Sequence, residues 1–136
     1  MRIRLLSDLH LEFCPWDPPR VAADVVVLAG DIHNGLAGIR WAAEQFSVPV
    51  IYVPGNHEYD GHDIIKLRER WRAPEWPDHV HVLDDRAVEI AGVRFVGSTL
   101  WTDFNLIRVS ERRHGRGFTH DVGLPAYSLW IGRADA

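Results

Sequence analysis

The apolar run DVVVLAG at residues 24–30 is the feature that most constrains the fold. Three valines and a leucine follow one another without polar alternation, which is typical of a strand buried on both faces of a parallel sheet. Two similar runs flank it: IRLLS at 3–7, which we expect to be a second buried strand, and VPVIYVPG at 48–55. These three runs predict the centre of an α/β fold.

One amphipathic segment lies between the second and third of these strands, and another follows the third. Residues 35–46 and 62–71 have helical spacing, and their expected apolar faces are Leu36, Ile39, Ala43 and Phe46 in the first and Ile64, Ile65, Leu67 and Trp71 in the second. Strands alternating with helices indicate an α/β sheet.

The pattern then changes to short strands, predicted at 80–84, 86–90 and 93–98, with Ala91-Gly92 as a hairpin turn between the last two. We expect residues 99–120 to be irregular and residues 122–136 to end in a short helix. The fold class predicted for residues 1–136 is one α/β domain with a mixed β-sheet flanked by helices.

Composition excludes several classes of function. The chain has 136 residues and a net charge of −4, so it lacks the basic footprint of a protein that binds nucleic acid by charge. The single cysteine, Cys14, cannot form an internal disulfide. No apolar run is long enough to span a membrane, and Asp8 comes too early for a signal-peptide core. We therefore expect a cytoplasmic protein.

Each of the three apolar runs ends in a polar cluster. The clusters are SDLH at 7–10, GDIH at 30–33 and GNHE at 55–58. Each one alone is explained by a turn or a helix cap. Because the carboxyl ends of parallel strands share one edge of a sheet, where such folds bind ligands, we expect the three clusters to converge.

Together these residue types favour metal-assisted phosphoester chemistry. Carboxylate, imidazole and amide donors suit two divalent ions such as Mn, Fe, Zn or Ni. Such a pair can clamp a phosphoryl oxygen and activate a water as hydroxide. His57, directly after Asn56, is then expected near the metals, where it would stabilise the transition state or protonate the leaving alkoxide.

The blocks SDLHLEF, LAGDIH and VPGNHEYD resemble the first three motifs of the calcineurin-like metallophosphoesterase superfamily, and GSTLWTDFN at 97–105 resembles a segment of one bacterial branch of it. The resemblance implies a shortened version of that family's α/β sandwich. It also implies that Asp8, His10 and Asp31 hold one metal and that Asp31 and Asn56 hold the other. His57 and the bridging Asp31 would be catalytic.

Other polar residues have weaker assignments. Glu58 is expected to orient or cap the third loop, and His33 to be a further ligand or to fill the rim of the pocket. The Gly-His-x-His pair of the usually longer family members does not occur, which leaves His114 and His120, the two histidines after Asn105, as possible additional metal ligands. We therefore expect a truncated relative or one that completes its core and site as a homodimer.

Three hypotheses of function follow. The first is a metallophosphoesterase acting on a small phosphomonoester or phosphodiester, including nucleotides. The second is a non-catalytic relative that serves as a metal-binding or interaction module. The third is a metal-dependent hydrolase of another class, although the chain has no His-Glu-x-x-His motif.

Overall fold

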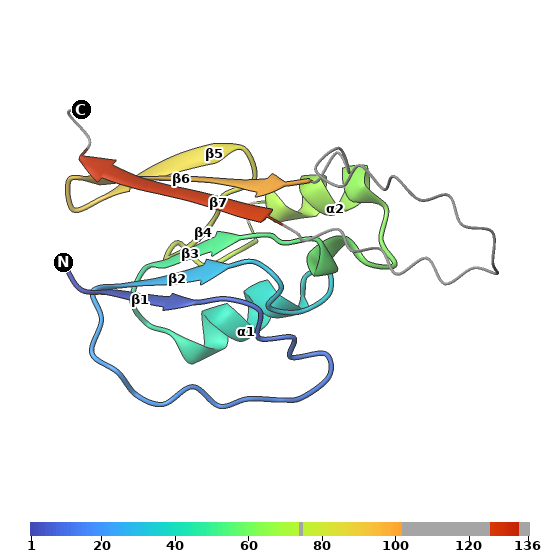
Figure 1. The fold of residues 1–136 in the computed structure, drawn as a ribbon, viewed down its shortest axis with the longest axis horizontal. Helices are drawn as coiled ribbons and strands as arrows, with labels where there is room; N and C mark the ends of the chain where they lie inside the picture. The colour runs from blue at the N-terminus through green and yellow to red at the C-terminus, as the bar shows by residue number, and fades with distance from the viewer. Residues whose placement is uncertain (74, 102–125, 134–136) are drawn as a thin grey trace, which may run out of the picture.

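Two sheets and two helices form the fold (Figure 1). The computed structural model describes residues 1–73, 75–101 and 126–133. A parallel sheet has the order β1-β2-β3-β4, formed by β1 (Ile3–Leu6), β2 (Val25–Ala29), β3 (Val50–Val53) and β4 (Val80–Val82). An antiparallel sheet has the order β5-β6-β7, formed by β5 (Arg86–Ile90), β6 (Val93–Leu100) and β7 (Ala126–Arg133). The helices are α1 (Ala37–Gln45) and α2 (Ile64–Trp71), and a 3-10 turn, η1 (His57–Tyr59), follows β3.

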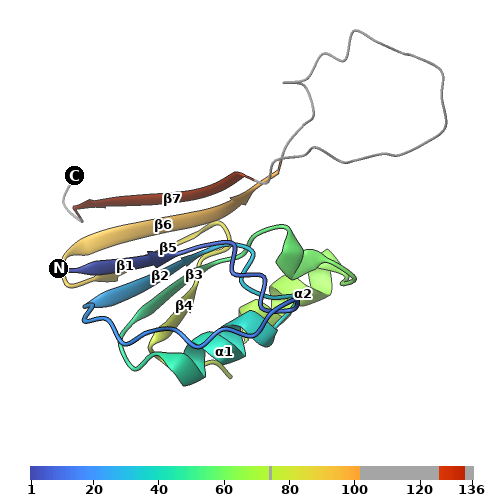
Figure 2. The same cartoon turned by 60° about the horizontal axis from the view of Figure 1, so that its bottom comes forward.

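The parallel sheet lies between two layers. Figure 2 shows the antiparallel sheet over one face and α1 against the other. Side chains alternate across a strand, so Val25 and Val27 pack in the cluster between the sheets, whereas Val26 and Leu28 pack in the cluster with the helices. All four side chains are buried, which confirms the two-faced burial predicted from the valine run.

The sheets approach closely at Gly97 in β6. A Cβ at this position would lie 2.6 Å from the Cβ of Leu83 and 2.8 Å from Cγ2 of Val53. Glycine therefore lets β6 lie directly against β3 and the segment that follows β4.

The α/β class is confirmed, and four details differ from the expectation. The strands divide between two sheets and do not form one mixed sheet. β1 is an edge strand and not a buried one, and the side chain of Leu5 is 62% exposed. In α2, Leu67 and Trp71 are buried as expected, but Ile64 and Ile65 are exposed, because the helix packs against the core through Leu67 and Trp71 and not through its first turn.

The fourth difference concerns residues 122–136, where the prediction of a short helix is wrong. Residues 126–133 form β7, which pairs with the whole of β6. The sequence AYSLWIGR is rich in aromatic and branched side chains, and pairing with a long neighbouring strand satisfies its backbone.

The structure leaves some expectations untested. Among the described residues, no helix has the length and apolar character needed to cross a membrane. The single domain over residues 1–136 and the homodimer stay predictions. Most of the segment expected to be irregular at 99–120, with His114 and His120, lies outside the described residues.

Candidate metal centre

The loops after β1 and β2 run side by side at the carboxyl edge of the parallel sheet. The N–H of Asp8 donates to the carbonyl of Gly30 at 3.0 Å, and the N–H of His10 donates to the carbonyl of Asp31 at 3.0 Å. The N–H of Leu11 continues the pairing with the carbonyl of Ile32 at 2.9 Å. The first two polar clusters are therefore fastened to each other by their backbones.

Three residues of these loops adopt the left-handed conformation. The φ angles are 54° at Asp8, 46° at His10 and 53° at Asp31. Outside glycine, this region costs about 1–3 kcal/mol per residue and is concentrated at functional sites. Only two other non-glycine residues of the described ranges have positive φ, Asp85 and Ala91. Three of the five strained residues are thus the candidate metal ligands Asp8, His10 and Asp31.

Asp8, His10 and Asp31 form a group that fits a metal ion. Their ligand atoms all lie within 4.8 Å of one another. Asp31 is buried, with only 2% of its surface exposed. No lysine or arginine in the described part of the chain forms an ion pair with Asp8, so a cation is well suited to this group.

The loop after β3 joins the same group. The N–H of His57 donates to Oδ1 of Asp31 at 2.9 Å. The side-chain oxygen of Asn56 is buried and has no hydrogen-bond partner among the described residues. A buried oxygen without a partner is costly, and a metal ion would satisfy it. Oxygen and imidazole donors in this combination fit the divalent ions expected from the sequence.

Glu58 joins the loop after β2 to the loop after β3, which confirms its expected orienting role. It is fully buried, and one oxygen accepts from the N–H groups of Asp31 at 3.1 Å and Gly55 at 2.8 Å. The other accepts from the N–H of Ile32 at 2.9 Å and the hydroxyl of Tyr52 at 2.8 Å. Burial raises the pKa of Glu58, and the hydrogen bonds from Ile32, Tyr52 and Gly55 oppose that rise.

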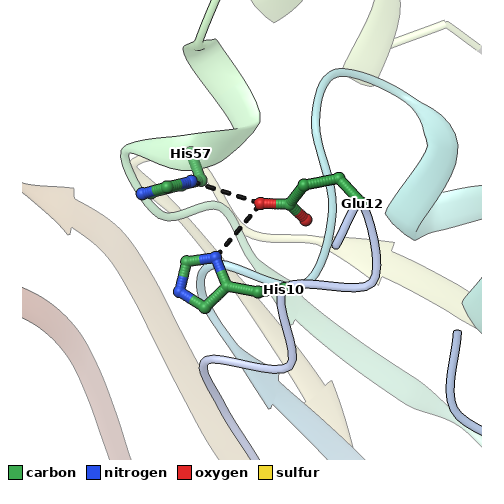
Figure 3. A group of neighbouring side chains, drawn as sticks. All are labelled: His10, Glu12 and His57. Carbon is green, nitrogen blue, oxygen red and sulfur yellow. Dashed lines mark hydrogen bonds and ion pairs between the residues drawn. The ribbon is translucent and has the colours of Figure 1, made fainter. Parts of the chain in front are cut away.

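Sequence reasoning missed Glu12, which lies between two histidines (Figure 3). Its Oε1 is 3.1 Å from Nδ1 of His10 and 3.2 Å from Nδ1 of His57. The two rings meet edge to face with centroids 4.4 Å apart. Burial acts to raise the pKa of Glu12, but hydrogen bonds from its own backbone and from both histidines, with the charge of His10, lower it overall.

A signal for Glu12 was present in the sequence. In SDLHLEF, polar and apolar residues alternate, so that Leu9 and Leu11 separate Asp8, His10 and Glu12. Leu9 and Leu11 pack in the core with α1. The side chains of Asp8, His10 and Glu12 therefore remain available to the site.

His57 also borders an open cavity. This cavity has a volume of about 460 Å³ and is lined by Asn56, His57, Tyr59, Asp60, Gly61 and Trp101. The imidazole of His57 is one-third exposed, and the ring of Tyr59 lies 5.1 Å from that of Trp101. A small ligand could therefore reach His57 from solvent.

His33 lies apart from the candidate metal groups. It lines a different cavity of about 360 Å³ together with Trp16 and Trp41, and its Nδ1 is buried without a hydrogen-bond partner in the part of the chain described here. Of the residues predicted for the site, the structure brings together Asp8, His10, Asp31 and His57. Asn56 precedes His57 with its side-chain oxygen buried, and His33 belongs to neither group of candidate ligands.

Comparison with known proteins gave one result. A model of the calcineurin-like phosphoesterase family matches residues 1–121, a range that contains all three polar clusters. Searches of curated proteins and of solved structures gave no match.

Proposed function

The chain belongs to the calcineurin-like phosphoesterase family, and from this membership we propose that it is a metal-dependent hydrolase of small phosphoesters. One observation carries the proposal: the donor atoms of Asp8, His10 and Asp31 gather within 4.8 Å of one another at the carboxyl edge of the sheet, with His57 bonded through its backbone to Asp31.

Asp8, His10 and Asp31 would hold one divalent ion, and Asp31 and Asn56 would hold the second. Mn, Fe, Zn and Ni all match these donors. When bound, the ions would supply positive charge against the phosphate and lower the pKa of a water molecule. Asp31, which both ions would share, is the residue on which the pair depends.

The remaining roles belong to the residues around the ions. The amide of Asn56 is neutral, so it adds no repulsion toward an anionic substrate. The imidazole of His57 is accessible from the cavity, where it can donate a proton to the leaving oxygen or a hydrogen bond to the phosphoryl group. The cavity falls in the size range of sites for small molecules.

Trp101 favours a substrate with a planar group. Its side chain is exposed and forms part of the wall of the cavity beside His57. Aromatic faces stack on nucleobases without requiring one sequence. A phosphoester that carries an aromatic ring, such as a nucleotide or an aryl phosphate, therefore fits this cavity better than a plain alkyl phosphate.

The test measures metal content and turnover in the same preparations. The protein, purified without chelator and supplied with Mn²⁺, should contain two ions per chain and hydrolyse nitrophenyl phosphate or bis-nitrophenyl phosphate. Asp31→Asn should lose both ions together with turnover. Asp78→Asn, a change of an exposed residue before β4, is the matched control and should alter neither quantity.

His57→Gln separates catalysis from metal binding. The variant should keep its ions but lose about 10²–10⁴-fold in kcat on an alkyl phosphate, and lose less on a nitrophenyl ester, whose leaving group needs no proton. If the protein binds metal but hydrolyses none of these esters, the proposal that it is an enzyme is wrong. That result would favour a non-catalytic metal-binding module.

A further inference from the structure

We propose that Glu12 is a positioning residue that fixes the tautomer and orientation of both His10 and His57. The inference deepens the proposed function and rests on it for the roles of the two histidines. It is carried by one oxygen, Oε1 of Glu12, which lies 3.1 Å from Nδ1 of His10 and 3.2 Å from Nδ1 of His57.

The proton positions follow from the acceptor. An ionised carboxylate has no proton to donate, so each Nδ1 must carry a proton to bond with Glu12. In a neutral ring this leaves Nε2 with a free lone pair. Figure 3 shows Nε2 on the far side of each ring from Glu12. His10 thus offers the lone pair of Nε2 to a metal. His57 presents Nε2 away from Glu12, and it donates to the substrate from that atom when the ring carries a second proton there while Nδ1–H stays bonded to Glu12.

Among the residues that the structure describes, Glu12 has few interaction partners other than the two histidines. Its side chain is 13% exposed, and no lysine or arginine within the described ranges forms an ion pair with it. Its other oxygen, Oε2, is buried without a hydrogen-bond partner there. The two imidazoles are therefore the side chains that hydrogen-bond to this carboxylate.

One carboxylate serving two rings has a mechanical consequence. The rings meet edge to face, with centroids 4.4 Å apart, so a rotation of one ring displaces the other. Because Glu12 anchors both, the metal-binding histidine and the substrate-facing histidine keep a fixed mutual geometry. Loss of the anchor should therefore affect metal binding and turnover together, as loss of an outer partner of a metal-binding histidine does.

A competing arrangement uses the same three residues differently. His10, Glu12 and His57 have ligand atoms within 4.8 Å of one another, so they could hold an ion directly between them. That ion would need both Nδ1 atoms without protons. The protonation state of the two Nδ1 atoms therefore decides whether Glu12 positions the histidines or binds an ion together with them.

The experiment reads the ring nitrogens directly. Nitrogen-15 NMR of the metal-free protein at about pH 8.5, above the usual histidine pKa, should show both rings protonated at Nδ1. Glu12→Leu removes the acceptor, and both rings should shift toward protonation at Nε2. Glu12→Gln keeps an oxygen acceptor and should restore much of the Nδ1–H signal. Glu69→Leu, at an exposed helix position, is the control.

Two further readouts complete the test. Glu12→Leu should lower zinc affinity or kcat by about 10–100-fold, with partial recovery in Glu12→Gln. If Glu12→Leu does not fold, Glu12→Asp, whose carboxylate is withdrawn by one methylene group, should show the same partial loss of Nδ1–H.

Tautomers that do not change in Glu12→Leu would overturn the proposal. Zinc bound at Nδ1 of both rings would also overturn it, in favour of the direct metal site. Because the NMR arm uses metal-free protein and needs no turnover, its result does not depend on whether the chain is a phosphoesterase.

Discussion

At the residue scale, the site depends on two acidic side chains that sequence reasoning did not assign to a metal. Glu12 lies among the histidines, and Glu58 lies beneath the loops. Glu58 gathers donors from residues as far apart in the chain as Asp31 and Tyr52. It therefore fixes the loop after β2 against the end of β3.

Glu58→Gln should destabilise the protein by roughly 2–4 kcal/mol. Both carboxylate oxygens accept two hydrogen bonds, and the amide nitrogen of glutamine would face two donors. Urea unfolding followed by circular dichroism measures the loss. Glu69→Gln, which changes an exposed side chain of α2, should stay within about 0.5 kcal/mol of the wild type. Equal stability of the two variants would contradict the role of Glu58.

The sequence predicted several site residues because their positions follow from the strands. Asp8, Asp31 and Asn56 each come directly after an apolar run, so the parallel sheet alone brings them to one edge. Glu12 lies four residues beyond the first of these, and the path of a loop is not determined by the strand before it. The close approach of Glu12 to His57, across 45 residues of chain, required the folded structure.

At the element scale, the packing of α1 on β3 controls the position of Glu58. Tyr52 of β3 is fully buried and donates its hydroxyl to Glu58 at 2.8 Å. The same hydroxyl lies 2.1 Å from where a Cβ of Gly38 would be. Glycine in the first turn of α1 therefore leaves the space through which Tyr52 reaches the loop.

Gly38→Ala should destabilise the protein by about 1–3 kcal/mol through overpacking, although alanine by itself favours a helix by about 1 kcal/mol over glycine. Tyr52→Phe removes the hydroxyl that causes the clash, so the double variant should be more stable than the sum of the two single changes predicts. Urea unfolding of the four proteins gives this coupling energy. A coupling energy of zero would show that the helix moves away without affecting Tyr52.

Elements were predicted best where local pattern and burial agree. The valines of β2 are buried on both faces, and both sides of the sheet are covered, so pattern and environment match. β1 has a similar apolar sequence, but its place at the edge of the sheet leaves Leu5 exposed. β7 was missed because its partner, β6, is distant in the chain, and a strand of this kind is specified by pairing.

At the scale of the whole molecule, metal binding should be coupled to folding. The candidate ligands come from three separate loops, between Asp8 and Asn56, which lie together only when the parallel sheet has formed. The unfolded chain has no such group. An ion that binds the folded state alone stabilises it by an amount set by its concentration relative to Kd.

Mn²⁺ at about 100 times its Kd should therefore add about 2.7 kcal/mol to the free energy of unfolding, which for a chain of this size raises Tm by roughly 10 °C. Differential scanning calorimetry with EDTA and then with excess Mn²⁺ measures the shift. His10→Ala removes a ligand and should abolish most of it, whereas Asp78→Asn at an exposed position should retain it in full. A shift of equal size in His10→Ala would mean that the ion binds elsewhere. No shift with Mn²⁺, Zn²⁺, Fe²⁺ or Ni²⁺ would mean that the three loops are held together by Glu58 and their backbone hydrogen bonds without any contribution from a metal.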